Sequence, residues 1–338
     1  MTKTVGLRGL VALVIGMSVA LGVGARVAAA PPGTPEQPTV VLNFNPALGQ
    51  LPESITSDRN GNLFASNVSG AIQKIDPQTG TFVTVATVSL PGGAQTTGIK
   101  VGPDGLIYVM SSSFSPSPAG AFMWRVSPTT GAVEQFATFD PTGFPNDLVF
   151  QDDGSIIVTD PFLARLWKVD TAGNVSVFLA SPLFAGNPTA PAFPGLPFGV
   201  DGIAWGDHNK RTLYVSTLDF GRVMSIPMHC GGTPPIRIIV EDPALEGVDG
   251  IAVDSRGTIW CAVNTQDRIA TVDKRGGISV ISQGSPLDGP SSFAFGTGNG
   301  DKKTLYIANF AIGSVLAGLP AHPGILSISA PVPGLPLP

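Results

Sequence analysis

Residues 247–264, GVDGIAVDSRGTIWCAVN, contain the pattern that decides the fold. Residues 248–253 alternate apolar with small or polar side chains, and residues 259–263 form a short apolar run, as strands do. Between them, residues 254–257 read as a tight turn whose glycine supplies a left-handed conformation. The stretch therefore predicts a β-hairpin, with a carboxylate, Asp249, near its start.

The same two-strand unit recurs along the chain. When turn glycines and first-strand aliphatic residues are aligned, six copies appear at intervals of 42 to 55 residues. Their first strands begin at Glu53, Thr97, Asn146, Asp201, Asp249 and Ser291. A repeat of roughly 40–50 residues with several short strands is typical of a propeller blade. The sequence predicts an all-β, six-bladed β-propeller with four antiparallel strands per blade.

The ends of the chain predict how the ring closes. Residues 40–44 read as a strand that precedes the first repeat as a fourth strand would, so we expect this N-terminal strand to complete the last blade and remove its open edge. Residues 324–329 are the competing closing strand. We assign residues 39–329 to the propeller, 31–38 to a Pro-rich linker and 330–338 to a disordered Pro-rich tail.

Residues 1–30 have the pattern of a secretory signal peptide. Lys3 and Arg8 precede an apolar run at residues 10–23, and small residues follow at 28–30. The alternative is an uncleaved anchor, although the apolar run is shorter than the ~18 residues of a spanning helix. We expect a secreted or periplasmic protein with no membrane attachment after cleavage.

The composition agrees with an exported all-β protein. The 338 residues include 42 Gly and 32 Pro, 43% are hydrophobic, and the formal charge is −5. Removal of residues 1–30 takes away Lys3, Arg8 and Arg26 and no acid, which makes the remaining chain more acidic still. An acidic chain with no basic run argues against nucleic acid as a partner, and we expect a monomer.

The two cysteines leave two interpretations open. Cys230 and Cys261 fall in neighbouring predicted blades, and they would form a disulfide in an oxidising compartment or remain as two buried free thiols. Neither cysteine belongs to a C-x-x-C pattern of the kind that binds zinc.

The residues that begin the six first strands form a polar column. Propeller blades converge on one axis, so equivalent positions of their innermost strands face one another. Every column residue is polar, whereas the position two residues later is apolar in every copy: Ile55, Ile99, Leu148, Ile203, Ile251 and Phe293. Carboxylates aimed at one axis repel unless they are protonated or neutralised by a cation, and oxygen-only ligands suit Ca²⁺. The alternative is a water-filled polar channel.

Four short motifs carry a resemblance to a known family. They are Pro52-Glu53-Ser54, Pro145-Asn146-Asp147, residues 200–205 (VDGIAW) and residues 248–254 (VDGIAVD). In order and spacing, over roughly residues 40–320, the chain resembles the senescence marker protein (SMP-30)/gluconolactonase family, which includes regucalcin. That resemblance implies a lactone hydrolase with one divalent ion on the propeller axis.

The resemblance also implies site residues. It gives Glu53, Asp201 and Asp249 as metal ligands and Asn146 as a contact to metal or substrate. Two features depart from the family pattern. Asp201 stands where the family usually has Asn, and Phe144 and Pro145 stand near the place of an Arg that contacts sugar hydroxyls. We therefore expect a substrate more apolar than a sugar lactone.

Two long loops indicate the same type of substrate. Residues 111–122 and 181–199 lie at the end of the propeller where the column begins. The second loop carries Phe184, Phe193, Leu196 and Phe198 among five prolines. A proline-stiffened apolar rim favours an apolar or aromatic ligand. The alternative is that both loops only pack over the blade edges.

These features predict a metal-dependent hydrolase of the lactonase or esterase type, with Ca²⁺ as cofactor and a small molecule as substrate. Asp249 or Asp201 would be the general base. The substrate contacts would come from Asn146, Thr97, Ser291, Phe144 and Phe198. One alternative is a non-catalytic binding propeller similar to the NHL type, without metal, and another is a metal propeller that has lost hydrolysis.

Overall fold

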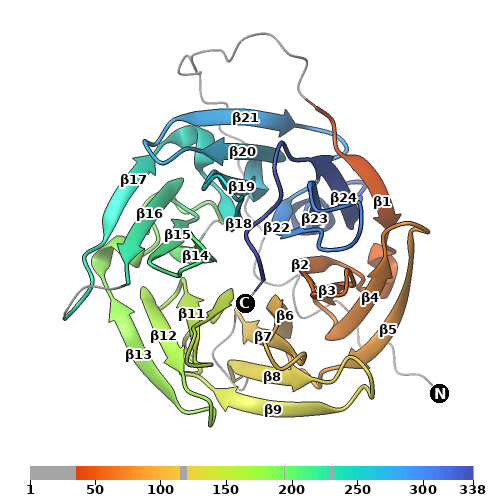
Figure 1. Ribbon diagram of the computed structural model, residues 1–338, viewed down its shortest axis with the longest axis horizontal. Coiled ribbons are helices and arrows are strands. Elements are labelled where there is room, and N and C mark those ends of the chain that lie inside the picture. The colour runs from red at the N-terminus through yellow and green to blue at the C-terminus, as the bar shows by residue number, and fades with distance from the viewer. Residues whose placement is uncertain (1–35, 115–119, 194, 229–231, 338) are drawn as a thin grey trace.

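A computed structural model describes residues 36–114, 120–193, 195–228 and 232–337. These residues form six four-stranded antiparallel sheets arranged as blades around a central axis (Figure 1). The predicted six-bladed, all-β propeller is confirmed. The predicted signal peptide, residues 31–35 of the predicted linker, and Cys230 lie outside the described residues. Within them, no helix is long and apolar enough to cross a membrane.

The strands of each blade run outward from the axis in chain order. The innermost strands are β2 (Pro52–Ser57), β6 (Ala94–Val101), β10 (Leu148–Phe150), β14 (Val200–Trp205), β18 (Val248–Val253) and β22 (Pro290–Phe295). The second strands are β3 (Leu63–Asn67), β7 (Ile107–Ser113), β11 (Ile156–Asp160), β15 (Thr212–Thr217), β19 (Ile259–Val263) and β23 (Thr304–Asn309).

The outer half of each blade completes the sheet. The third strands are β4 (Ala71–Asp76), β8 (Phe122–Val126), β12 (Arg165–Val169), β16 (Arg222–Pro227), β20 (Arg268–Val272) and β24 (Gly324–Ser329). The fourth strands are β5 (Thr81–Thr87), β9 (Val133–Thr138), β13 (Val175–Ala180), β17 (Arg237–Glu241), β21 (Ile278–Gln283) and β1 (Thr39–Asn43). Every residue of β3 and β7 is buried, whereas β5 and β17 alternate between half-buried and exposed residues.

The last blade combines the two ends of the propeller. Strand β1 pairs antiparallel with β24, with Thr39 opposite Ser327 and Asn43 opposite Gly324 (Figure 1). The N-terminal strand is therefore the fourth strand of blade six, as predicted. The competing segment, residues 324–329, is the third strand of the same blade. The ring closes without leaving a strand edge open between its first and last blades.

The core lies between neighbouring blades. One cluster joins blades two and three through Met110, Met123, Ile156 and Val158, and each of these side chains is buried. Residues that alternate along a strand face opposite sides of its sheet. Each blade therefore contributes one apolar face to each of its two neighbours, and the axis itself is left to the innermost strands.

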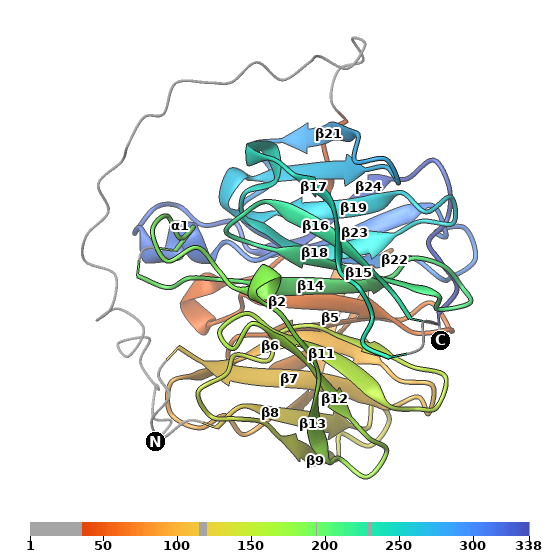
Figure 2. The same ribbon diagram turned by 90° about the vertical axis from the view of Figure 1, so that its left-hand side faces the viewer.

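The two faces of the ring differ. The mouth face, where the innermost strands begin, carries the loop of residues 181–199 with η4 (Pro182–Phe184) and also carries α1 (Ile312–Leu316). The short 3₁₀ helices η3 (Pro46–Leu48), η5 (Pro243–Leu245) and η6 (Asn264–Gln266) lie in connections of the same kind. The tail face carries the turns between first and second strands and the C-terminal segment. Figure 2 shows α1 and the C-terminus on opposite sides of the ring.

Aspartates at the tail-face turns have a structural role. Asp58 accepts hydrogen bonds from the backbone N–H groups of Asn60 and Asn62, both at 2.8 Å. Asp273 accepts from Arg275 and Gly277 in the same way. The turn acids Asp76, Asp104, Asp153 and Asp170 also accept from backbone N–H groups. These acids stabilise turns and are not ligands of a site.

The C-terminal segment differs from the expected disordered tail. Gly334 forms an isolated antiparallel bridge with Asp254. The Leu335 N–H donates to the Val253 carbonyl at 3.2 Å, and the Ser255 N–H donates to the Pro333 carbonyl at 2.9 Å. Proline lacks an N–H but keeps its carbonyl, so a Pro-rich segment can still pair where its other residues donate. Residues 333–337 thus cross the tail face beside blade five.

Candidate functional site

The column residues lie at irregularities of the innermost strands. In the pairing of β18 with β19, the register shifts between Val248 and Ile251, which is where Asp249 lies. The same shift surrounds the column residues of β2, β6, β14 and β22, which are Glu53, Thr97, Asp201 and Ser291. A β-bulge leaves one residue outside the ladder and changes the direction of its side chain. Five of the six column side chains are placed by such bulges.

The sixth column residue, Asn146, lies just before β10 and is held by different contacts. Its N–H donates to the Thr159 carbonyl at 2.9 Å, and its carbonyl accepts from the Gly98 N–H at 2.8 Å. At Gly98, a Cβ would collide with that carbonyl. Gly202 and Gly250 contact the carbonyls of Asp249 and Ser291 in the same way. The lack of a side chain at these glycines lets neighbouring innermost strands approach closely.

Three of the four predicted metal ligands have a buried oxygen with no hydrogen-bond partner. These atoms are Glu53 Oε2, Asn146 Oδ1 and Asp201 Oδ1. The side chains are 7%, 5% and 1% exposed. Buried polar atoms nearly always have a partner, because an unsatisfied one costs about 1–3 kcal/mol. Unpartnered carboxylate and amide oxygens at equivalent positions of three blades fit a bound cation or donor ligand.

The charges of the three column carboxylates oppose one another. Burial raises the pKa of Glu53, Asp201 and Asp249 well above the ordinary values of these groups. The charge of Asp201 further raises the pKa of both Glu53 and Asp249. Protonation or a cation would relieve this repulsion.

The column supplies oxygen donors of the kind that a metal ion requires, but they are not grouped around one point. Within the described residues, no group of three or more His, Cys, Asp or Glu side chains is placed to hold an ion by itself. The three carboxylates of the predicted set, Glu53, Asp201 and Asp249, are therefore not grouped closely enough to share an ion as they stand. All four members supply oxygen, and oxygen donors from carboxylates and amides are those that Ca²⁺ prefers. The chemistry of the set fits Ca²⁺, whereas the spacing of its carboxylates in this structure does not by itself form an ion site.

Three further polar residues belong to the same region and were not selected from the sequence. Asp147 is 7% exposed, and its charge raises the pKa of Glu53, Asp201 and Asp249. Lys100 forms an ion pair with Asp147 at 3.3 Å. The Asn264 amide donates to Asp249 Oδ2 at 3.3 Å and so orients that carboxylate.

Sequence signals for these residues exist but are weak. Asp147 occupies the position where the other blades have Ser or Gly: Ser54, Gly98, Gly202, Gly250 and Ser292. A single acid in a row of small residues is an anomaly that an alignment of the repeats displays. Lys100 and Asn264 lie on other strands or turns, and only the fold brings them near their partners.

The hydroxyls of Thr97 and Ser291 donate hydrogen bonds to neighbouring blades. Thr97 Oγ1 donates to the Pro145 carbonyl at 3.0 Å, and Ser291 Oγ donates to the Glu53 carbonyl. Similar bonds run from second strands to the next column: Ser66 to the Thr97 carbonyl, Ser112 to Pro145, Thr159 to Asp201 and Ser216 to Asp249. A structural role therefore accounts for these two hydroxyl protons, and a substrate contact from either residue stays a prediction.

An aromatic cluster lies on the mouth face beside Asn146. Its buried members are Phe144, Phe198 and Leu218, with Phe114, Phe162, Ala192, Phe193 and Leu196 packed against them. Phe144 and Phe198 have ring centroids 5.4 Å apart in an edge-on arrangement. Phe184 lies outside this cluster because it is buried in the core between blades three and four. The predicted apolar rim therefore consists of aromatics from four loops that pack mainly on one another.

Two buried acids hold the loops that carry this cluster. Asp160 Oδ1 accepts from the Phe144 N–H at 3.0 Å. Asp219 accepts from the backbone N–H groups of Asn187, Ala192 and Phe198 at 2.7–2.8 Å. Burial raises the pKa of both acids. They position Phe144 and Phe198 through the backbone.

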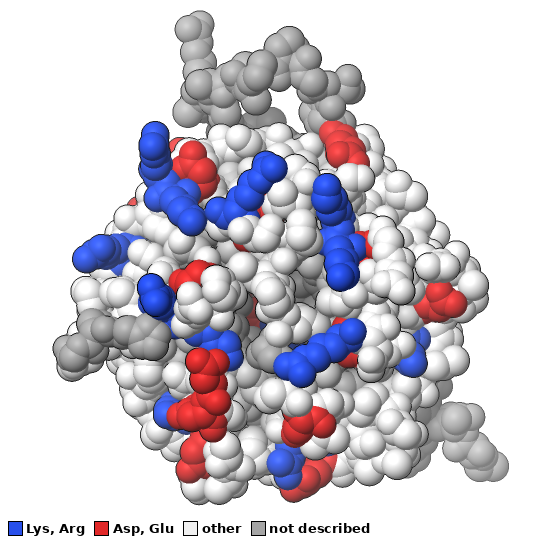
Figure 3. Space-filling view, in the orientation of Figure 1, with Lys and Arg blue, Asp and Glu red and all other residues white. Residues whose placement is uncertain are grey.

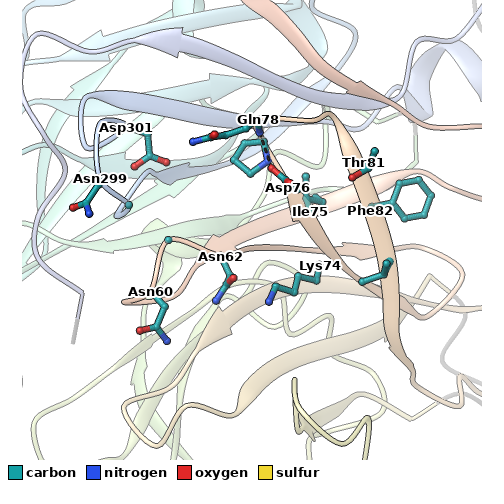
Figure 4. A pocket seen from close by; sticks show the side chains of 14 residues that line it. Asn60, Asn62, Lys74, Ile75, Asp76, Gln78, Thr81, Phe82, Asn299 and Asp301 are labelled. Atoms are coloured by element: carbon teal, nitrogen blue, oxygen red, sulfur yellow. Dashed lines mark hydrogen bonds between the residues drawn. The ribbon is translucent and has the colours of Figure 1, made fainter.

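Two cavities lie away from the column residues. One, of about 610 Å³, lies at the turns of blades one and six and is lined by polar side chains such as Asn60, Asn62 and Asp301 (Figure 4). The other, of about 570 Å³, lies on the axis at the tail face, below the column. Neither includes Glu53, Asn146, Asp201 or Asp249 in its lining. The column is therefore a separate feature of the axis.

Comparison with solved structures shows the same fold. A luciferin-regenerating enzyme aligns with a TM-score of 0.64 and 16% identity over 89% of this chain and 98% of its own. The calcium-binding protein regucalcin from Agrobacterium tumefaciens aligns at 0.63 and 16% over 89% and 94%. A gluconolactonase from Xanthomonas campestris aligns at 0.58 and 18% over 93% and 100%.

Sequence comparison identifies the family of this chain but no individual curated relative. A search of curated proteins gives no match to this chain. In contrast, the family model for the SMP-30/gluconolactonase/LRE-like region matches residues 119–310, which is more than half of the chain. This match includes the column residues of blades three to six, and the fold and the order of its motifs agree with it. The chain belongs to the SMP-30/gluconolactonase/LRE-like family.

Proposed function

We propose that this protein is a metal-dependent hydrolase of lactones or esters. Membership of a family whose name includes gluconolactonase supports the lactonase class. The observation that carries the metal is the set of buried, unpartnered oxygens on Glu53, Asn146 and Asp201. Those three residues together with Asp249 would hold the ion, and their oxygen donors favour Ca²⁺. When bound, such an ion polarises a carbonyl and stabilises the negative charge that develops on its oxygen.

Within this proposal, Asp249 is the better placed of the two candidate bases. It is half-buried, whereas Asp201 is 1% exposed. The Asn264 amide fixes one oxygen of Asp249, at 3.3 Å. Asp249 would accept the proton of the attacking water, and Asp201 would remain a ligand.

The aromatic cluster supports an apolar substrate. Phe144 immediately precedes the Pro145-Asn146 pair, and Phe198 lies three residues before Asp201. Both belong to one apolar cluster at the mouth face. An apolar surface beside a polar column would bind the hydrocarbon or aromatic part of an ester and exclude water from it. The predicted signal sequence supports action outside the cytoplasm, where such a substrate would be met.

The proposal is tested by metal binding before turnover. Protein stripped with EDTA is unfolded thermally during titration with Ca²⁺, Mg²⁺, Mn²⁺ or Zn²⁺, and then incubated with a panel of aliphatic and aromatic lactones and esters. We expect Ca²⁺ to raise the unfolding midpoint, because a ligand that binds only the folded state stabilises it. Glu53→Gln and Asp249→Asn should abolish both this rise and turnover, and Asp170→Asn, at an exposed turn, should change neither.

The outcomes separate the alternatives. A midpoint that no ion shifts would exclude the metal hydrolase and leave a binding propeller. A Ca²⁺ shift without turnover of any ester or lactone would indicate a metal propeller that has lost hydrolysis. Full turnover in Glu53→Gln would show that the column is not the site.

A further inference from the structure

The tail-face cavity differs in charge from the protein as a whole. Arg59, Lys100 and Lys302 line it, and no Asp or Glu of the described residues does. The whole chain has 24 acidic and 19 basic residues, so a cavity with three cations and no acid departs from the average composition. Figure 3 shows this face, with Lys and Arg side chains around a central hollow.

The inner wall of the same cavity is apolar. The apolar position two residues after the column contributes Ile55, Leu148, Ile203, Ile251 and Phe293. Phe150, Trp205 and Phe295 continue this surface toward the tail face. Because these residues come from five different blades, the fold converts a repeated core position into a continuous apolar lining.

The cations lie at different depths in the cavity. Lys100 is the inner cation. It belongs to β6, and its Nζ forms an ion pair with Asp147 Oδ1 at 3.3 Å. Arg59 and Lys302 lie on exposed turns of blades one and six, at the solvent end. These two blades are neighbours, and Ser57 Oγ donates to the Phe295 carbonyl at 2.8 Å between them. The cavity is therefore apolar inside and cationic at its mouth.

The C-terminal segment forms part of the wall. Residues 333–337 line the cavity and are attached to blade five by two backbone hydrogen bonds, to Val253 and from Ser255. Leu335 also packs against the core between blades four and five. The segment also contacts blade six, where a Cβ on Gly334 would collide with Phe295, so it lies across the tail end of the axis beside blades five and six (Figure 1).

We propose that this cavity binds an amphipathic monocarboxylate, an aliphatic acid of about ten carbons, which is a size that suits small-molecule cavities of this volume. The hydrocarbon chain would lie among Ile203, Ile251 and Phe293. The carboxylate would lie at the opening, near Arg59 and Lys302, where exposed cations attract an anion without having to bury it. The site is separate from the column and does not depend on the proposed hydrolase activity.

The test is calorimetric titration of the full-length protein with decanoate, decanol and butyrate. Decanoate should bind. Decanol, which lacks the charge, and butyrate, which lacks the chain, should bind at least about fivefold more weakly. The double variant Arg59→Gln/Lys302→Gln should weaken decanoate binding by about fivefold to thirtyfold. Lys168→Gln, a cation outside the cavity, should leave it unchanged.

Three results would overturn the proposal. The first is no decanoate binding up to its solubility limit. The second is equal affinity for decanoate and decanol, or wild-type affinity in the double variant, because either would remove the role of the cations. The third is loss of decanoate binding in Asp249→Asn with full binding in the double variant, which would move the ligand to the mouth face. A failure of Ca²⁺ binding or ester turnover would affect none of these measurements.

Discussion

The ammonium nitrogen of Lys100 lies 3.3 Å from Asp147 Oδ1, and this ion pair joins blade two to blade three beside the axis. Asp147 also accepts from the Leu148 N–H at 2.8 Å and from the Ile203 N–H at 3.4 Å, so its carboxylate bridges blades three and four as well. Gly98 leaves room for it, since a Cβ there would meet Asp147. One acid thus connects three blades at the level of the column.

Replacing Lys100 with Met should lower the free energy of unfolding by about 2 kcal/mol at neutral pH. The change leaves Asp147 buried beside the column carboxylates without its counter-ion. The control is Lys168→Met, because Lys168 pairs with Asp153 at 3.3 Å on the exposed surface. That pair should contribute less than about 0.5 kcal/mol. Urea denaturation measures both, and equal effects in the two variants would contradict the structural role of Lys100.

The sequence predicts the fold and the column because both depend on repetition. Glu53, Asp201 and Asp249 are recognisable because each is polar at a position that starts a repeated apolar pattern. The β-bulges that aim these side chains cannot be read from one strand, because a bulge is a relation between a strand and its partner. Asp147 stands out in the alignment of the repeats as the one acid in a row of small residues, but only the fold shows that Lys100 is its partner.

Two predictions from the sequence, the apolar rim and the disordered C-terminal tail, were wrong at particular residues. Phe184 belongs to the expected rim by sequence, but η4 turns it into the core between blades three and four. Residues 330–338 are expected to be disordered because of their prolines, yet Leu335 and Pro333 supply the N–H and the carbonyl that pair with blade five. In both segments proline restricts the backbone without deciding which side chains become buried.

In protein stripped of metal, the free energy of unfolding should fall as the pH rises above about 4. The pKa of Glu53, Asp201 and Asp249 is raised in the folded state. The folded protein therefore keeps protons that the unfolded chain has released. This stabilisation is complete below the unfolded pKa and is lost as the pH rises through the higher folded values.

Urea denaturation in EDTA over a pH series measures this slope. Asp201→Asn removes one of the three groups and should flatten the decrease. Asp170→Asn is the control, because local hydrogen bonds lower the pKa of Asp170 and give it the opposite sign, with stability lost toward acid pH. An Asp201→Asn variant with the wild-type slope would show that this carboxylate titrates normally.

Asp219→Asn should loosen the loop of residues 181–199 without unfolding the propeller. The carboxylate accepts three backbone hydrogen bonds from this loop, and an amide in its place cannot accept all three with the same strength, at a local cost of about 1–3 kcal/mol. Limited chymotrypsin digestion should cut after Phe198 faster in this variant, because Pro194 and Pro197 block cleavage after Phe193 and Leu196. Asp170→Asn, which also changes an acid that accepts backbone N–H groups, should be cut at the wild-type rate.

Ser216→Ala should destabilise the protein by about 1–2 kcal/mol, because Ser216 Oγ donates to the Asp249 carbonyl at 2.8 Å and accepts from the Gly202 N–H at 2.9 Å. Ala262 occupies the equivalent place in blade five, opposite β18 as Ser216 is opposite β14. Ala262→Ser should therefore stabilise by about 1 kcal/mol through a bond toward blade six. Thermal unfolding compares the two variants. If Ala262→Ser destabilises the protein, the new hydroxyl does not form a hydrogen bond with blade six.

Within the described part of the chain, the hydroxyl bonds between blades connect Glu53 with Asp249 in only one direction around the ring. From Glu53, a continuous series of such bonds passes through blades two, three and four to Asp249. The shorter way round, through blade six, crosses from blade five without a described hydroxyl bond, and the Asn264 amide reaches Gly289 there at 3.3 Å. The hydroxyl bonds between blades thus run along the long arc. At the boundary between blades five and six, apolar packing that includes Trp260 and Phe293 takes their place, together with the Gly289 N–H that donates to Asp267 Oδ1 at 2.7 Å, so an opening of the ring there would have to break both.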